Sequence, residues 1–189
     1  MPGDTRARIL QATTELMRRN GYAGTSMNDV GTAAGARMSS LYFHFPGGKE
    51  QMAAEAVAAS ARRFLDYLHA ELPTAASPGD VVCSYFAPSI RALETSDFQA
   101  GCPVGTPAND APATATTLKT ACDRALGQFA GAVARELQRL GRTPERAQAE
   151  SILIVAANQG AILLSRTAGD KEPIQAALDS LLLLIDKAS

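Results

Sequence analysis

The sequence has no tryptophan, only two histidines and only three cysteines among its 189 residues. The cysteines, Cys83, Cys102 and Cys122, are odd in number and widely spaced, which argues against a disulfide framework and a structural zinc site. The histidines, His44 and His69, have no cluster of cysteines or carboxylates beside them, so a metal site is not expected. We therefore predict reduced thiols and no cofactor.

Long apolar runs are also lacking. A membrane-spanning helix needs about eighteen consecutive apolar residues. The longest apolar stretch, 152–164, is interrupted by Asn158, Gln159 and Gly160. The N-terminus passes directly into charged residues without the apolar core of a signal peptide. We predict a folded cytoplasmic protein that has no membrane partner.

Charge is spread unevenly along a chain whose formal net charge is −1. Residues 1–49 carry six basic and three acidic side chains, whereas the remaining residues carry twelve basic and sixteen acidic ones. Positive charge attracts polyanions such as nucleic acids. If either end of the chain faces a polyanion, it is therefore the N-terminal one.

Three short helices are predicted near the N-terminus. Apolar and small residues recur at helical spacing over 4–20, up to an Asn-Gly pair that ends the helix. Ser26 followed three residues later by Asp29 is a variant of the capping box and predicts a second helix, which Gly35 ends. A third helix is expected over 39–44, before a Pro-Gly-Gly break. Two short helices joined by about four residues that include glycine are typical of a helix-turn-helix.

The rest of the chain is also predicted to be helical, because no stretch alternates apolar and polar residues with the period of a strand. Pro88 lies inside one of the predicted helices and is expected to kink or split it. The stretch 97–116 is rich in Gly, Pro, Ala and Thr, so its structure is the least predictable in the chain. The fold class is therefore all-α, with further helices over 49–72, 80–95, 118–140, 144–167 and 174–185.

The N-terminal segment closely resembles the DNA-binding domain of TetR-family repressors over about fifty residues. The resemblance rests on GYAGTSMNDV at 21–30, AAGARMSSLYFHF at 33–45 and GKE at 48–50. FPGGKEQ at 45–51 and GCPV at 101–104 also resemble the LmrA/YxaF-like branch of the family. The resemblance implies a helix-turn-helix DNA-binding domain over 1–48 and a helical ligand-binding and dimerisation domain over 49–189.

By resemblance, the third helix enters the major groove of DNA and flanking hydroxyls hold phosphates. Arg37 stands where the family usually has Ser or Thr, so the usual helix cap is missing; the side chain either reads a guanine or pairs with a phosphate. Met38 is placed to touch a thymine methyl. Tyr42 and Phe43 are alternatively core aromatics. The predicted DNA contacts are Thr25, Ser26, Arg37, Met38, Ser39, Ser40, Tyr42, His44 and Lys49.

The C-terminal part carries candidates for an effector site and for a dimer interface. Asn158 and Gln159 lie in an apolar helix, and a buried unpaired amide costs about 1 to 3 kcal/mol, so they bond either across a dimer or to a ligand. The apolar surface of 152–164 and of the last helix predicts packing against a second copy, that is, a homodimer. Candidate contacts with a small, largely apolar effector, or alternatively core residues, are Phe64, Phe86, Phe98, Cys102, Phe129 and Asn158.

These observations predict a ligand-responsive repressor that binds a palindromic operator as a homodimer and that its effector releases. The alternative within regulation is a thiol sensor, which would need an exposed cysteine of low pKa beside a cation. A helical enzyme would need a convergent set of acid, base or nucleophile, and neither such a set nor a glycine-rich phosphate motif is found, so no catalysis is expected. A protein used only for dimerisation would not need the helix-turn-helix.

Overall fold

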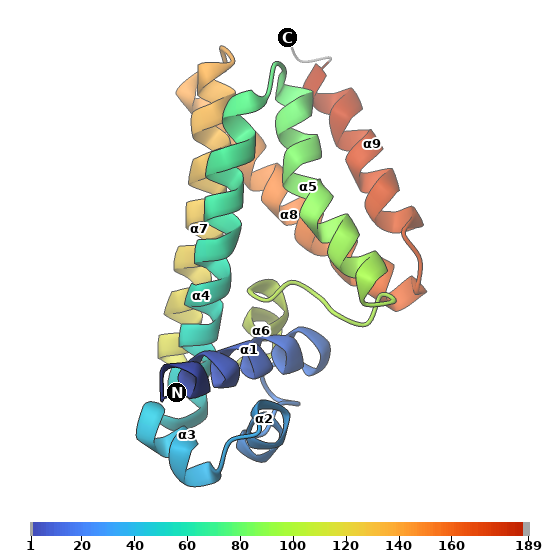
Figure 1. The fold of residues 1–189 in the computed structure, drawn as a ribbon. Helices are drawn as coiled ribbons and strands as arrows, with labels where there is room; N and C mark the ends of the chain where they lie inside the picture. Colours follow the sequence, from blue (N-terminus) through green and yellow to red (C-terminus); the bar gives the residue numbers. More distant parts are fainter. Residues whose placement is uncertain (1, 187–189) are drawn as a thin grey trace. The chain divides into compact units, whose positions relative to one another are not determined.

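Helices make up the regular structure of the protein in a computed structural model that describes residues 2–186 (Figure 1). No strand occurs within these residues, which confirms the all-α prediction. The elements are α1 (Pro2–Asn20), α2 (Met27–Ala34), α3 (Met38–His44), α4 (Gly48–Glu71), the 3-10 turn η1 (Leu72–Thr74), α5 (Pro78–Thr95), α6 (Gly105–Asp110), α7 (Thr116–Arg139), α8 (Pro144–Ala168) and α9 (Glu172–Asp186).

Local capping signals set several of these boundaries. The predicted capping box of Ser26 and Asp29 starts α2, and a second box, of Ser77 and Asp80, starts α5. Thr143 caps α8, because its side chain accepts a hydrogen bond from the backbone N–H of Arg146. These side chains bind backbone N–H groups that the first turn of a helix leaves unpaired.

Helix α5 runs unbroken through Pro88, so the predicted split does not occur. Proline has no backbone N–H, so the carbonyl oxygen of Ser84, four residues earlier, loses its helical partner. The hydroxyl of Tyr67 donates a hydrogen bond to this oxygen at 3.0 Å. A side chain from α4 thus supplies the donor that the proline lacks.

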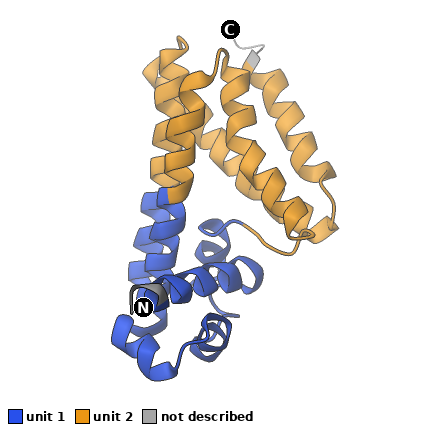
Figure 2. Cartoon of the chain, viewed as in Figure 1, with its two compact units in different colours: residues 1–62, 102–125 blue, residues 63–101, 126–189 orange. Residues whose placement is uncertain are grey.

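The chain divides into two compact units (Figure 2). Unit 1 comprises residues 1–62 and 102–125, and therefore holds α1, α2, α3, the first part of α4, α6 and the start of α7. Helix α1 packs against α2 and against α6. The apolar core under the helix-turn-helix consists of Ile9, Val30, Ala34, Leu41, Phe45 and Met52.

Unit 2 comprises residues 63–101 and 126–189. Helices α5, α8 and α9 pack against one another within it. The ring of Phe64 meets those of Tyr85 and Phe129 edge to face, with centroids 5.5 and 4.8 Å apart. Tyr85 and Phe86 are among the largest fully buried side chains. The core of this unit is therefore partly aromatic.

One helix among the described residues, α8, is long and apolar enough to cross a membrane by length and composition, with a mean hydropathy of 1.3. In the 18-residue stretch of α8 to which this value applies, 39% is buried inside the molecule. The core helix of a soluble protein passes the same test. The large apolar residues that α8 and α9 leave exposed are Ile152, Leu153, Leu163, Leu164, Leu183 and Leu184.

Candidate nucleic-acid interface

Glycines set the turn between α2 and α3. Gly35 has a φ of 59°, in the left-handed region that favours glycine. The backbone N–H of Ala36 donates to the carbonyl of Gly31 at 2.9 Å. A side chain at Gly31 would place its Cβ only 3.1 Å from the carbonyl oxygen of Ala36. The absence of a side chain at Gly31 therefore lets the turn fold closely against α2.

Ser26 and Asp29 bind each other at the start of α2. The hydroxyl of Ser26 accepts from the backbone N–H of Asp29 at 3.1 Å and donates to its carboxylate at 2.6 Å. The carboxylate also accepts from the backbone N–H of Ser26 at 3.2 Å. These hydrogen bonds, the one with the Ser26 side chain first, lower the pKa of Asp29. A DNA contact by Ser26 stays a prediction.

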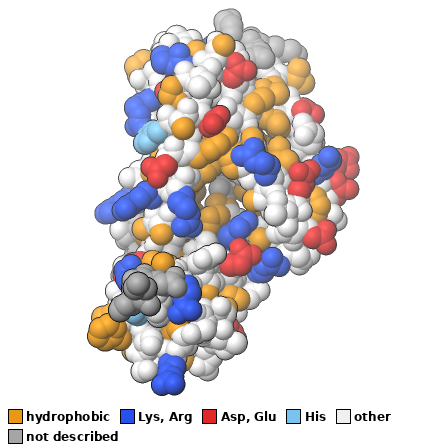
Figure 3. All heavy atoms as spheres, viewed as in Figure 1, with side chains coloured by type: hydrophobic (Ala, Val, Ile, Leu, Met, Phe, Trp, Pro, Cys, Tyr) orange, Lys and Arg blue, Asp and Glu red, His pale blue; other side chains and the backbone are white. Residues whose placement is uncertain are grey.

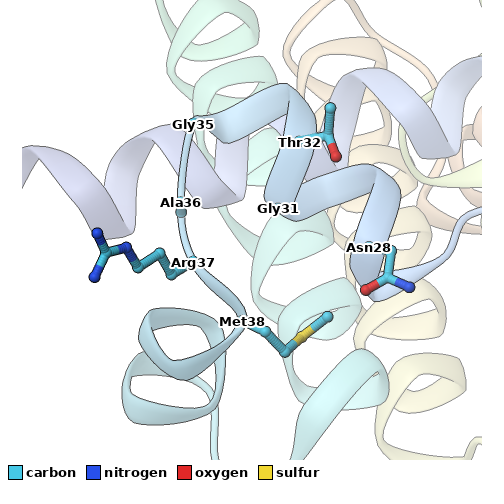
Figure 4. A pocket seen from close by; sticks show the side chains of 7 residues that line it. All are labelled: Asn28, Gly31, Thr32, Gly35, Ala36, Arg37 and Met38. Atoms are coloured by element: carbon cyan, nitrogen blue, oxygen red, sulfur yellow. The ribbon is translucent and has the colours of Figure 1, made fainter.

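Helix α3 begins at Met38 without a side-chain cap, because the residue in the cap position is Arg37. The Arg37 side chain is exposed and extends away from the side of the turn on which Asn28 and Met38 lie (Figure 4). An open groove of about 450 Å³ lies here, lined by Asn28, Gly31, Thr32, Gly35, Ala36, Arg37 and Met38. Arg37 is thus free to reach a ligand without breaking a helix cap.

The two faces of α3 differ sharply. Leu41 and Phe45, one helical turn apart, are fully buried in the core of unit 1. Tyr42 and Phe43 are 54% and 81% exposed. Figure 3 shows a group of hydrophobic side chains at the lower left of the view, in the region where Figure 1 places α3. The alternative that these two are core aromatics is therefore wrong. His44 is half-buried, with its ring 5.1 Å from that of Phe43.

The two serines of α3 and Met38 complete the surface. Ser39 is exposed, whereas Ser40 and Met38 are half-buried. Met38 packs against the core of unit 1, so only part of its side chain faces outward. The exposed set on and before α3 is therefore Arg37, Ser39, Tyr42 and Phe43, of which Phe43 was not among the predicted contacts.

Thr25 lies inside the turn that precedes α2. Thr25 is only 2% exposed, and its hydroxyl donates a hydrogen bond to the carbonyl oxygen of Gly21 at 2.7 Å. A hydroxyl has a single hydrogen to donate. Its predicted phosphate contact, which nothing in the structure tests, would require this hydrogen to change partner.

Lys49 lies near the start of α4 and close to Tyr22. Its ammonium group is 4.3 Å from the centroid of the Tyr22 ring and 3.5 Å from the carbonyl oxygen of Ala23. Burial lowers the pKa of Lys49, and the carboxylate of Asp110 opposes this effect. Burial also raises the pKa of the Tyr22 hydroxyl, with a smaller contribution from Glu50. A DNA phosphate would compete with these partners for Lys49.

The candidate effector residues are divided between the units. Phe64, Phe86, Phe98, Phe129 and Asn158 belong to unit 2, whereas Cys102 belongs to unit 1. Phe64 and Phe129 touch, Phe86 is fully buried, and Phe98 is half-buried with a φ of 58°.

Asn158 has an incompletely bonded amide in the core of unit 2. The residue is 2% exposed, and its Oδ1 accepts from the hydroxyl of Ser89 on α5 at 3.1 Å. Its buried Nδ2 has no hydrogen-bond partner. If the side-chain amide were flipped, its nitrogen would face Ser89 and its oxygen would take the position that has no hydrogen-bond partner. One polar atom of Asn158 therefore lacks a partner in either orientation.

Comparisons with known proteins cover both parts of the chain. Residues 9–56 match the family model for bacterial regulatory proteins of the tetR family, and residues 78–180 match the model for the C-terminal domain of LmrA/YxaF-like transcriptional regulators. The HTH-type transcriptional regulator LmrA of Bacillus subtilis is 32% identical over 172 residues, which are 91% of this chain and 92% of that protein. The uncharacterized regulator YxaF of the same organism is 28% identical over 185 residues, or 98% and 97% of the two chains.

Solved structures share the fold. A TetR-family transcriptional regulator from Agrobacterium tumefaciens superimposes with a TM-score of 0.87 at 21% identity, over 98% of this chain and 99% of that one. The TetR-family regulator CifR, solved with 26-bp double-stranded operator DNA, gives a TM-score of 0.79 at 20% identity, over 92% and 93%.

Proposed function

Because this chain belongs to the TetR family of transcriptional regulators, with an LmrA/YxaF-like C-terminal domain, we propose that it is a repressor that binds a palindromic operator as a homodimer and is released by a small, largely apolar effector. Residues 1–48 would bind double-stranded DNA, and residues 49–189 would bind the effector and form the dimer. The protein would act in the cytoplasm, without catalysing a reaction.

The exposed face of α3 carries the DNA-binding part of this proposal. Leu41 in α3 and Phe45 directly after it are buried and fix the helix to the core, while Ser39, Tyr42 and the preceding Arg37 are exposed. The major groove of B-DNA, about 12 Å wide, admits one α-helix. Arginine at the start of such a helix can donate two hydrogen bonds to a guanine, and Tyr42 can donate one to a phosphate.

The test is the salt dependence of binding to DNA from the promoter region of the protein's own gene. Each phosphate contact contributes about 0.9 to the slope of log affinity against log salt. We expect Lys49→Ala to weaken binding to all sequences alike and to lower the magnitude of this slope by about one. Arg37→Ala should instead cost about 1 to 3 kcal/mol and relax specificity at one base pair, if Arg37 reads a guanine.

Lys119→Ala is the matched control, because it removes the same charge from an exposed position in α7. It should leave both the affinity and the slope unchanged. Equal binding of the wild-type protein to promoter DNA and to unrelated DNA would contradict the proposed function. An unchanged slope for Lys49→Ala would show that this lysine only packs on Tyr22.

The dimer part of the proposal is supported by the exposed leucines and isoleucine of α8 and α9. The two helices pack against each other and expose six large apolar side chains, and large exposed apolar surfaces mark binding sites for partners. A second copy of the same patch is the commonest way to cover it, through a two-fold axis. We therefore attribute the apolar surface of α8 to a dimer interface rather than to a membrane span.

The effector part is supported by Asn158. A buried amide atom without a partner costs about 1 to 3 kcal/mol, so a ligand that supplies the partner gains that amount. The same unit contains the aromatic cluster of Phe64, Tyr85 and Phe129, and aromatic side chains commonly line the sites of apolar ligands. We therefore propose that the effector is largely apolar and carries a hydrogen-bonding group that reaches Asn158.

A further inference from the structure

The turn between α1 and α2 is bound by a carboxylate from a distant part of the sequence. The backbone N–H groups of Tyr22 and Ala23 donate to the two oxygens of Asp110, each at 2.9 Å. Asp110 is the last residue of the short helix α6, and all three residues belong to unit 1. Hydrogen bonds to an ionised acceptor are about twice as strong as neutral ones.

Gly21 shows how closely these segments fit. Its φ is +75°, and a Cβ built on it would lie 2.2 Å from the Oδ2 atom of Asp110. Any other residue at position 21 would therefore displace the carboxylate. The glycine and the aspartate, 89 positions apart in the sequence, form one structural unit.

A positive charge lies near Asp110, and a separate hydrogen bond ties the same distant segment to the start of α4. The ammonium group of Lys49, above the ring of Tyr22, is close enough to Asp110 for the carboxylate to act on its pKa. The neighbouring carboxylate, Glu50, accepts a hydrogen bond from the backbone N–H of Thr117 at 2.7 Å. Residues 102–125 thus hold both the turn before α2 and the start of the helix after α3.

We propose that Asp110 is a positioning residue for DNA binding, which fixes the direction of α2 and α3 by holding the turn that leads into them. The inference rests on the proposed function, because it assumes that α3 reads DNA. Without the carboxylate, water would satisfy the N–H groups of Tyr22 and Ala23, and the turn would have other conformations open to it. Fewer molecules would then present α3 correctly.

The test compares Asp110→Ala with Asp123→Ala, which removes the same charge from an exposed position of the same segment. Removing an acidic charge should strengthen binding to DNA if charge alone matters. If Asp110 positions α3, its removal should instead weaken binding to promoter DNA. We expect Asp110→Ala to weaken binding to promoter DNA by about tenfold, within the range typical of coupled sites, while binding to unrelated DNA is unchanged or slightly tighter. Asp123→Ala should weaken neither.

Hydrogen exchange at the amides of Tyr22 and Ala23 is the second measurement, and it needs no DNA. Exchange should be slow in the wild-type protein and in Asp123→Ala, and fast in Asp110→Ala. If Asp110→Ala fails to fold, Asp110→Asn replaces it, because its remaining carbonyl oxygen can accept one of the two hydrogen bonds; it should lose less preference for promoter DNA.

Three outcomes would overturn the proposal. Unchanged exchange in Asp110→Ala would show that the carboxylate does not hold the turn. Faster exchange with an unchanged preference for promoter DNA would show that holding the turn does not position α3. A wild-type protein without any preference for promoter DNA would refute the proposed function as well, and slow exchange at Tyr22 and Ala23 would then leave Asp110 as a purely structural contact.

Discussion

Cys122 is buried, which makes it a poor candidate for a thiol sensor. Burial and, secondarily, the nearby Cys102 raise the pKa of Cys122 to about 11. The thiolate is the reactive form, and at pH 7 only about one Cys122 in ten thousand carries it. We expect iodoacetamide to alkylate Cys122 in the native protein about a hundredfold more slowly than the exposed Cys83, as measured by peptide mass mapping.

Unfolded protein is the control, because all three cysteines should then react at similar rates. Alkylation of native Cys122 as fast as Cys83 would revive the thiol-sensor alternative for this residue. A slow Cys122 would instead leave Cys83 and Cys102 as the thiols available to such a sensor.

Side-chain roles were predictable where helical spacing decides them. Leu41 and Phe45 are four residues apart, so both face the core and the residues between them face outward. The same spacing could have identified Phe43 as exposed, but aromatic character favoured a core position as strongly. Asp110 could not have been found, because its partners are two backbone N–H groups that leave no mark on the sequence.

At the scale of helices, the capping box of α5 depends on pH. The carboxylate of Asp80 accepts from the backbone N–H groups of Ala76 and Ser77, at 3.0 and 2.9 Å. The hydrogen bond with the Ser77 side chain, followed by these two, lowers the pKa of Asp80 from its ordinary value of 3.8. A carboxylate whose pKa is lower in the folded state stabilises that state above its unfolded pKa.

We expect Asp80→Asn to lower the free energy of unfolding at pH 7, because an amide is a weaker acceptor for these N–H groups. The difference in the free energy of unfolding between variant and wild-type protein should shrink as the pH falls below about 4 and through the folded-state pKa of Asp80. Urea unfolding curves followed by circular dichroism measure this difference. Ser77→Ala, which removes the cap, should cost about 1 kcal/mol at pH 7. Asp66→Asn, at an exposed site in α4, is the control. A difference that persisted undiminished at pH 2 would contradict this explanation.

Helix boundaries followed from the sequence where caps and glycines mark them, as at Ser26 and Gly35. Two features did not follow. Helix α6 has only six residues in a segment rich in glycine and proline, and it packs on α1, a contact that local patterns do not reveal. The continuity of α5 depends on the hydroxyl of Tyr67, a donor from another helix.

At the scale of the whole molecule, residues 102–125 group with the N-terminal helices rather than with their neighbours in sequence. Contacts between distant parts of the chain cause this grouping, such as those of Asp110 and of Glu50. Periodicity and composition describe only local structure, so they predicted the helices but not this assembly. The boundary between residues 48 and 49 stays a prediction about function.

Gly160 indicates how two copies would meet. It lies on the exposed face of α8, between Ile152 and Leu164, and a Cβ built on it would touch nothing within 4 Å. Glycine inside a helix costs about 1 kcal/mol relative to alanine. Packing within one chain therefore does not explain the glycine, whereas the close approach of a partner helix would.

We expect Gly160→Leu to fold normally but to weaken dimerisation by about 5- to 150-fold, because overpacking the interface costs about 1 to 3 kcal/mol. Sedimentation in the absence of detergent measures the dimerisation. Gly127→Leu is the matched control, because Gly127 is also helical, exposed and without contacts, but lies on α7. Dimeric helix-turn-helix proteins bind half-sites about 34 to 36 Å apart, so the variant with weaker dimerisation should also bind promoter DNA more weakly. If both variants dimerise as the wild-type protein does, α8 does not cross its partner at Gly160; a wild-type protein that is monomeric at micromolar concentration would refute the dimer itself.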